Sequence, residues 1–277
     1  MTKSDVVVAD GFWAAGLESL PYVTSHQHGI WSHLTELDVR AGKPPDMPHH
    51  HAAQVEFRRR WKGLGKRMTA VSDFISQEMH IQWGYESRVI NNGVDTDIWK
   101  PDTAKFGRKR PLVLHGVNDP GNINKGADHI RMLEQMLDAD VMSLDQAFTR
   151  WGRAFGTPDC PQGTKPQVLA QADLFVHPSG FEGNSMMVAQ ALACGLPFVG
   201  YRVGALAFAH ETQLGEIIDL QNRHPRVTLD AVRHVLGEIT SGHDKHCGTN
   251  ARQFALDNLS LTRFKQQWRS YVEEMIA

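Results

Sequence analysis

Short runs of apolar residues recur along the chain, and each is followed by a turn and then by a segment of helical character. The runs are rich in Val and Ile and are bounded by Gly, Pro, Asp and Asn, which is typical of buried parallel strands. Strands that alternate with helices predict parallel sheets built from right-handed crossovers. We expect strands at residues 5–10, 21–27, 67–73, 87–93, 111–117, 139–144, 173–179, 196–203 and 215–220.

A polar stretch with two prolines, residues 95–111, separates the first four strands from the rest and is the best candidate for a domain linker. In the second half, residues 126–138 have one apolar face and predict a helix. The last 28 residues are expected to be helical, with a break near 258–261. The sequence therefore predicts an α/β protein with two Rossmann-like domains, the first unusually short. The expected segments are 1–100, 101–255, and a C-terminal helix at 256–277.

Composition makes some classes of function less favoured. Of 277 residues, 41% are apolar, as in an ordinary globular protein. The net charge is -2, so no overall electrostatic attraction to nucleic acid or to a membrane surface is expected. No run approaches the roughly 18 apolar residues of a membrane span. Scattered cysteines without a CxxC pair favour a reducing compartment, and the N-terminus does not resemble a signal peptide. A cytoplasmic protein is expected.

Two basic runs stand out against this balance, at residues 57–67 and 105–110. They fit either solvated loops and helix ends or a surface that faces an anionic acceptor. The histidines also attract attention, because His26 and His28 alternate on a predicted strand and a run of three follows at 49–51. No acid or cysteine cluster completes a ligand set, so we expect no metal site.

Two Gly-rich segments, residues 115–126 and 177–185, follow predicted strands and precede helices in the second domain. Open α/β sheets bind ligands beyond the carboxyl ends of their strands. Two helix N-termini, one capped by Asn184 or Ser185, and Lys125 would make a phosphate cradle. Glu182 would repel a phosphate and is better suited to sugar hydroxyls. A nucleotide sugar would supply both groups, although tight turns alone would also explain the glycines.

Residues 177–205, "HPSGFEGNSMMVAQALACGLPFVGYRVGA", resemble the donor-site signature of the retaining glycosyltransferases of family four, which have the GT-B fold. Other segments resemble that family in the same order. They are "VTSHQHGIW" (23–31), "AVSDF" (70–74), "VINNGVDTDIWKP" (89–101), "NKG" (124–126) and the C-terminal helices. The resemblance covers essentially the whole chain. It implies that residues 1–100 form a shortened acceptor-side domain, that residues 101–255 form the nucleotide-sugar domain, and that the C-terminal helix at 256–277 packs back on the first domain.

The resemblance implies roles for individual residues. Glu182 would contact hydroxyls of the transferred sugar, Lys125 would bind the diphosphate, and His28 would lie near the sugar. These three are the expected catalytic residues. The expected donor-binding residues are Gly116, Asn118, Lys125, Ser179, Phe181, Gly183, Asn184, Ser185 and Gln190. The family generally needs no metal, and the nucleotide-diphosphate sugar is a substrate, so no cofactor is implied.

Several positions depart from the family pattern. Gln190 stands where the signature has a second acid, and Val117 stands where an arginine usually pairs with the lysine. The opening βα units with their Gly-Gly loop have no counterpart before Asp5, and the second domain is trimmed between 140 and 172. These departures leave a non-catalytic GT-B relic that binds a ligand or partner as an alternative.

The implied function is transfer of a sugar to an acceptor hydroxyl with retention of configuration. The acceptor is open between a saccharide, a lipid-linked carrier, a small molecule, and a hydroxymethylated base in DNA as in compact phage transferases. The sequence leaves the oligomeric state open, a homo-oligomer included.

Overall fold

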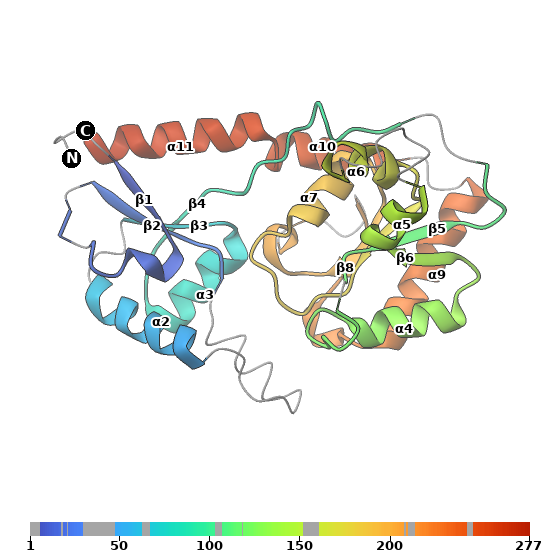
Figure 1. Cartoon of the computed structure of the whole chain (residues 1–277), viewed down its shortest axis with the longest axis horizontal. Helices are drawn as coiled ribbons and strands as arrows, with labels where there is room; N and C mark the ends of the chain where they lie inside the picture. The colour runs from blue at the N-terminus through green and yellow to red at the C-terminus, as the bar shows by residue number, and fades with distance from the viewer. Residues whose placement is uncertain are drawn as a thin grey trace.

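The structure is a computed structural model and describes residues 6–17, 19–20, 22–29, 48–62, 67–102, 107–117, 119–151, 161–207, 209, 214–242 and 246–277. Two α/β units lie side by side along the long axis of the molecule, and the C-terminal helix runs back over the first (Figure 1). Each unit has its own parallel sheet, with strand orders β1-β2-β3-β4 and β6-β5-β7-β8-β9.

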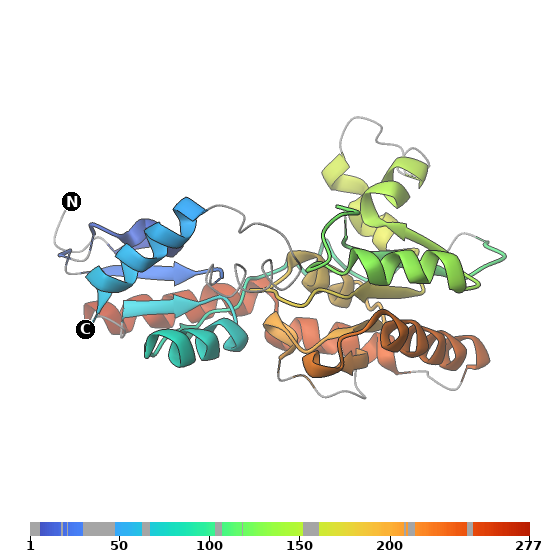
Figure 2. The ribbon, with the colours of Figure 1, turned by 90° about the horizontal axis from the view of Figure 1, so that it is seen from below.

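The first domain is a sheet of four short parallel strands between helical layers. Its strands are β1 (Val7–Asp10), β2 (Val23–Gln27), β3 (Met68–Ala70) and β4 (Arg88–Val89). Helices α2 (Pro48–Trp61) and α3 (Asp73–Trp83) cover one face, and α11 (Leu261–Ile276) covers the other (Figures 1 and 2). Apolar side chains of α2 and α3, including Phe57, Trp61, Ile75 and Met79, pack on the sheet and are fully buried.

Helix α11 is joined to the first domain by polar and aromatic contacts. The Tyr271 hydroxyl donates to Thr24 Oγ1 at 2.9 Å, and the Trp268 ring meets the His26 ring edge-on at 5.1 Å between centroids. Arg88 of β4 pairs with Glu274 at 2.5 Å. The last helix is therefore part of the first domain.

The second domain is a five-stranded parallel sheet with helices on both faces. Its elements are β5 (Leu112–His115), α4 (Ala127–Met136), β6 (Asp140–Ser143), α5 (Leu144–Trp151), α6 (Pro161–Ala170), β7 (Leu174–His177), α7 (Met186–Ala193), β8 (Phe198–Tyr201), β9 (Gly215–Ile218), α9 (Pro225–Ser241) and α10 (Cys247–Asn258). Alternate strand residues face opposite cores: Leu112 and Leu114 pack with α5, α7 and α10, and Val113 packs with α4 and α9. Short 3-10 turns, Gly11–Ala14, Gly204–Leu206 and Leu220–Asn222, complete the described elements.

Strand order defines where this sheet can bind a ligand. The chain leaves β5 to one side to form β6 and then crosses to the other side to form β7. The carboxyl ends of β5 and β7 are therefore the topological switch point, where the connecting loops part and leave a crevice.

The predicted fold class is confirmed, and all nine predicted strands are present. The predicted helix at 126–138 is α4, and the predicted break falls at residues 259–260, between α10 and α11. Helices α2 and α3 were not predicted. The domain limits at residues 100 and 255 stay predictions. Within the described residues, no helix is long and apolar enough to cross a membrane.

Candidate functional site

Three charged or polar side chains meet at the switch point. Lys125 Nζ donates to Glu182 Oε1 at 2.6 Å, and His177 Nε2 lies 3.0 Å from the same oxygen. Lys125 comes from the turn before α4, His177 ends β7, and Glu182 lies in the loop before α7. The structure thus brings together two of the predicted catalytic residues and adds His177, which was not predicted.

The cluster holds Glu182 as a carboxylate. Burial alone would raise the pKa of Glu182, but the hydrogen bond and charge of His177 and the charge of Lys125 outweigh it and hold that pKa at about 2. A carboxylate can only accept, so His177 Nε2 carries the proton of their hydrogen bond. The Glu182 side chain is only 14% exposed, whereas Lys125 is 44% exposed. The lysine is therefore the member that an arriving anion can reach.

A single arginine clamps the two loops that carry this cluster, and it was missed by the sequence reasoning. Arg223 donates from Nη2 to the Ile123 carbonyl at 2.7 Å and from Nε to the Pro178 carbonyl at 3.2 Å. The Gly180 N–H also donates to the Asn124 carbonyl, at 2.9 Å. Because these bonds join residues 123–124 to residues 178–180, they set the distance between Lys125 and Glu182.

Two buried groups at the end of β5 complete the switch point. The Val117 N–H donates to His115 Nδ1 at 3.2 Å, which leaves the proton of the neutral ring on Nε2. Burial and the nearby His177 lower the pKa of His115 to about 4, so the ring is neutral at pH 7. His115 Nε2 finds no partner among the described residues. The end of the Met187 side chain on α7 packs over Gly116, where a Cβ would lie 2.6 Å from Met187 Cε.

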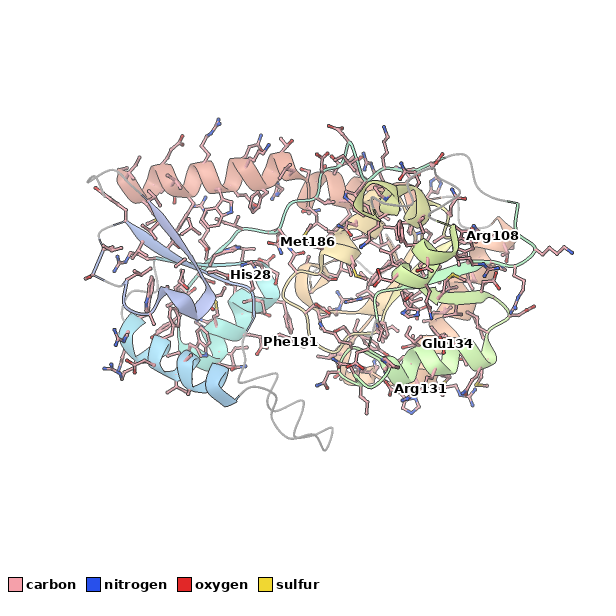
Figure 3. All side chains as sticks on the ribbon, in the orientation of Figure 1. His28, Arg108, Arg131, Glu134, Phe181 and Met186 are labelled. Carbon is pink, nitrogen blue, oxygen red and sulfur yellow. The ribbon has the colours of Figure 1, made fainter. Side chains whose placement is uncertain are left out.

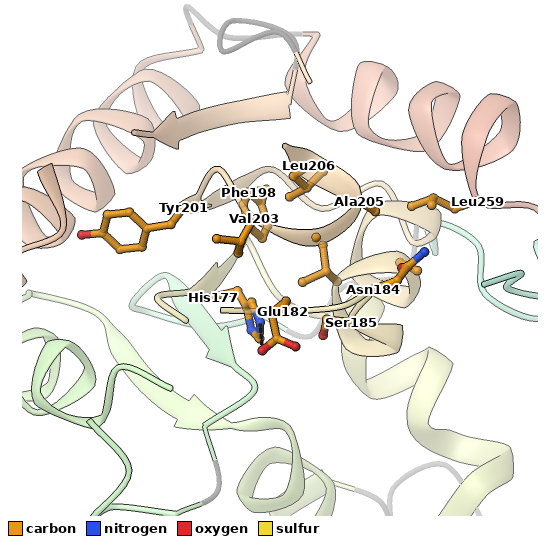
Figure 4. Close-up of a pocket in the computed structure, with 13 residues that line it drawn as sticks. His177, Glu182, Asn184, Ser185, Phe198, Tyr201, Val203, Ala205, Leu206 and Leu259 are labelled. Atoms are coloured by element: carbon orange, nitrogen blue, oxygen red, sulfur yellow. Dashed lines mark hydrogen bonds and ion pairs between the residues drawn. The ribbon is translucent and has the colours of Figure 1, made fainter. Parts of the chain in front are cut away.

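Two hollows flank the cluster. One lies between α4 and the start of α5, is lined by His115, Val117, Arg131, Glu134 and Gln146 among others, and has a volume of about 370 Å³. The other is lined by His177, Glu182, Ser185 and residues of β8 and the turn after it (Figure 4). The centre of a water molecule has about 10 Å³ to occupy there, room for roughly one water. Of these two hollows, only the first has room for a ligand of nucleoside size.

Three predicted donor-binding residues lie at the contact between the domains. Phe181 is 4% exposed and belongs to the core of the first domain, where its ring meets that of Phe74 at 5.4 Å between centroids. At Gly183, the backbone carbonyl of His28 occupies the place that a Cβ would take. Asn184 Nδ2 donates to the Val71 carbonyl at 3.0 Å. The loop around Glu182 therefore bridges the domains (Figure 3).

The remaining predicted donor residues have simpler placements. Ser179 is fully buried and its hydroxyl donates to the Phe181 carbonyl at 2.9 Å. Ser185, one of the two predicted capping residues, is the N-cap residue of α7 but makes no side-chain capping bond; it lines the small hollow. Gln190 is half-buried on α7. Asn118 lies outside the described residues.

His28 lies at the end of β2, on the edge of the first sheet that faces the second domain. Its Nε2 is 3.3 Å from Asp10 Oδ1, and its ring meets the His26 ring edge-on at 4.8 Å, so the two histidines share a face as predicted. His26 Nδ1 is bonded to Thr69 Oγ1 at 2.8 Å. Across the ranges that the structure describes, no three His, Cys, Asp or Glu side chains are grouped as metal ligands.

The arginines of the two basic runs are engaged within the protein. Arg58 donates to the Gln82 carbonyl and lies over the Trp83 ring, and Arg67 donates to the Leu20 carbonyl. Arg108 pairs with the half-buried Asp173 at 2.8 Å. These side chains hold the fold together. A DNA acceptor stays a prediction, and a charge reversal at Arg58 would test folding as much as binding.

Comparisons with known proteins agree with this geometry. Residues 128–237, about two fifths of the chain, match the family model for glycosyl transferases group 1. Sucrose-phosphate synthase from Thermosynechococcus elongatus superposes with a TM-score of 0.75 at 13% identity, over 98% of this chain and 73% of that one. A glycosyltransferase from Rickettsia africae gives 0.63 at 11% identity, over 98% of both chains.

HepE of Anabaena, in complex with UDP-glucose, gives a TM-score of 0.61 at 17% identity, over 90% of this chain and 71% of that one. These structural neighbours are GT-B glycosyltransferases, and at such low identity they show the fold alone. The chain therefore has the GT-B fold, as the resemblance implied. Comparison with curated protein sequences gives no match.

Proposed function

We propose that this protein transfers a sugar from a nucleoside diphosphate sugar to an acceptor hydroxyl with retention of configuration. The observation that carries the proposal is the pairing of Lys125 with Glu182 at 2.6 Å, at the switch point of the second sheet. The family-model match over 128–237 and the UDP-glucose bound by the similar HepE support the same donor class.

The diphosphate would take the exposed Lys125 ammonium and the first free N–H groups of α4, where the helix dipole favours an anion. Glu182, released from the lysine and still held by His177, would accept hydrogen bonds from hydroxyls of the sugar. His28 would face the sugar from the first domain, and Gln190 would contact the ribose. The nucleoside would extend into the hollow between α4 and α5.

In the transfer step, the bond between sugar C1 and the diphosphate oxygen breaks, and a bond from C1 to the acceptor oxygen forms on the same face. The acceptor proton passes to the departing diphosphate, so no separate protein base is required. Lys125 would stabilise the charge that develops on the leaving group, which is usually a large catalytic contribution. Val117 supplies no second cation there, so Lys125 would carry most of this stabilisation.

The test is release of nucleoside diphosphate from a panel of donor sugars, followed for the wild type and for Lys125→Ala. We expect the wild type to turn over one donor and Lys125→Ala to lose at least 100-fold, the order seen when one electrostatic donor is removed. Lys265→Ala, on the exposed side of α11, is the matched control and should keep full activity.

Wild-type activity that survives in Lys125→Ala would contradict the site. Donor binding without turnover on every acceptor would favour the non-catalytic alternative.

A further inference from the structure

The hollow between α4 and α5, proposed above to hold the nucleoside, is lined by charged side chains that have not yet been given a role. Its volume of about 370 Å³ lies within the usual range for small-molecule sites. Apolar side chains, including Val117, Ala127 and Ile130, line it together with the buried His115. Six of its ten lining residues are polar or charged, so the hollow suits a flat heterocycle whose edge offers hydrogen-bonding groups.

One face of α4 supplies the charges. Residues 127, 130, 131 and 134 follow helical spacing and all line the hollow, so Arg131 and Glu134 border the same space. No ion pair or side-chain hydrogen bond joins either of them to another residue in the described part of the chain. The start of α5 adds a second carboxylate, Asp145, which is 3.9 Å from Lys165.

The distance along α4 matches the reach of a nucleoside. Lys125 and the first turn of α4 lie at the diphosphate end of the proposed site. Arg131 and Glu134 follow Ala127 by four and seven residues, which is about 6 Å and 10 Å along a helix that rises about 1.5 Å per residue. A donor with its diphosphate at Lys125 therefore presents the edge of its base, rather than its ribose, to these two side chains.

We infer that this hollow selects guanine, so that the donor is a guanosine diphosphate sugar; this rests on the proposed function. Guanine offers two adjacent N–H donors, at N1 and N2, which one carboxylate can accept together, and an O6 acceptor beside them for a guanidinium. Glu134 and Arg131 have the complementary groups.

The other bases fit this wall less well. Uracil would direct two carbonyl oxygens and a single N–H toward the carboxylates. Adenine and cytosine each offer one amino group on that edge and no adjacent ring N–H. Each of these bases therefore leaves at least one hydrogen bond of Glu134 or Arg131 unmade that guanine would make.

The experiment is a calorimetric titration of the full chain with GDP, IDP, UDP and ADP. IDP is guanosine diphosphate without the N2 amino group and isolates the second hydrogen bond. We expect GDP to bind tenfold or more tightly than IDP, a difference of about 1.4 kcal/mol or more, because IDP leaves one hydrogen bond to the carboxylate unmade. UDP should bind more weakly still.

The variant Glu134→Gln should remove the preference. Its amide can accept one N–H and would point its own NH₂ at the other donor, so GDP should fall to the level of IDP while UDP is unchanged. Glu273→Gln, an exposed glutamate on α11, should bind like the wild type.

The outcomes separate the two proposals. Tightest binding of UDP or ADP, abolished by Lys125→Ala, would leave the donor site standing and overturn the guanine inference. An unchanged GDP to IDP ratio in Glu134→Gln would also overturn it. Binding of no nucleotide by the wild type would overturn the proposed function itself.

Discussion

The backbone carbonyl of His28 in the first domain lies on the place that a side chain at Gly183 of the second domain would fill. The two domains therefore touch through backbone, next to Glu182, with no room for a methyl group. The two domains can therefore meet in this way only with a glycine at position 183.

We expect Gly183→Ala to hold the domains apart. The new Cβ would overlap the His28 carbonyl, which is backbone and cannot swing away as a side chain end can. Small-angle scattering should give a larger radius of gyration, and transfer activity should fall at least tenfold. Gly237→Ala is the control, because nothing lies within 4 Å of its Cβ position on α9. It should gain about 0.5–1 kcal/mol of stability. Equal radii for both variants would contradict the closure argument.

Glu182 should make stability fall at low pH. Its pKa is depressed from 4.5 to about 2 in the folded state, so its stabilisation is complete above pH 4.5 and is lost as pH falls through 2. The shift corresponds to about 3 kcal/mol. In urea unfolding, the wild type should be more stable than Glu182→Gln at pH 5, and the difference in unfolding free energy should shrink by about 3 kcal/mol between pH 5 and 2.

The matched control is Glu56→Gln. Hydrogen bonds from Arg59 and Arg60 also hold the pKa of Glu56 at about 2, but Glu56 is exposed and its pairs are screened by solvent. Its variant should follow the wild-type pH curve closely. If the wild type lost its stability advantage over Glu56→Gln and over Glu182→Gln to the same extent, burial of the Glu182 cluster would add nothing to the pH dependence of stability.

Three buried histidines should lower the stability of the fold as the pH drops from 6.5 to 4, a higher range than that of Glu182. Burial, with charged neighbours, lowers the pKa of His26 to about 3 and of His115 and His129 to about 4. The unfolded chain takes up their protons below pH 6.5 and the folded chain does not, so stability falls between pH 6.5 and 4.

Each of these histidines should contribute about 1.4 kcal/mol per pH unit to that slope. His129→Gln, which can still bond the Thr228 hydroxyl, should reduce the slope of unfolding free energy against pH by about one proton. His80→Gln, at an exposed site, should leave it unchanged. A slope that is insensitive to His129 would show that this ring is protonated in the folded state.

Arg223 should matter to the site without touching the ligand. Arg223→Met leaves the carbonyls of Ile123 and Pro178 without their donor and should cost about 1–3 kcal/mol. Donor affinity should fall as well, because the Lys125 turn is no longer tied to the loop of Glu182. Arg223→Lys should restore only part of both, since an ammonium lacks the planar fork.

Thermal unfolding and donor titration measure the two effects of Arg223. The exposed Arg226→Met is the control and should change neither. Loss of stability with unaltered donor affinity would limit Arg223 to a role in the fold.

Much of the secondary structure could be predicted from local sequence patterns. Short Val- and Ile-rich runs are typical of buried strands, so all nine strands were predictable. Helix α2 was not predicted because its sequence is rich in His, Ala and Arg, and among its large apolar residues only Phe57 and Trp61 are fully buried. Its apolar signal is two residues, too few to define a period.

The candidate site was predictable where a residue lies in a recognisable segment after a strand. Lys125 and Glu182 each lie in such a Gly-rich segment, 57 residues apart, and the structure pairs them. His177 gave a signal that could have been used, because it ends a predicted strand five residues before Glu182. Arg223 gave none, since its partners lie 45 and 100 residues away. Which domain a loop side chain packs into is likewise set by tertiary contacts, which is why Phe181 was predicted only as a donor residue.

The position of α11 bears on how the chain is made. Residues 261–276 cover one face of a sheet whose strands lie between residues 7 and 89, and Thr24 and His26 are buried there beside Tyr271 and Trp268. During synthesis, that face stays uncovered until residues 261–276 have left the ribosome. The second domain is one continuous segment and can form earlier, so the half that is translated first is the half that finishes last.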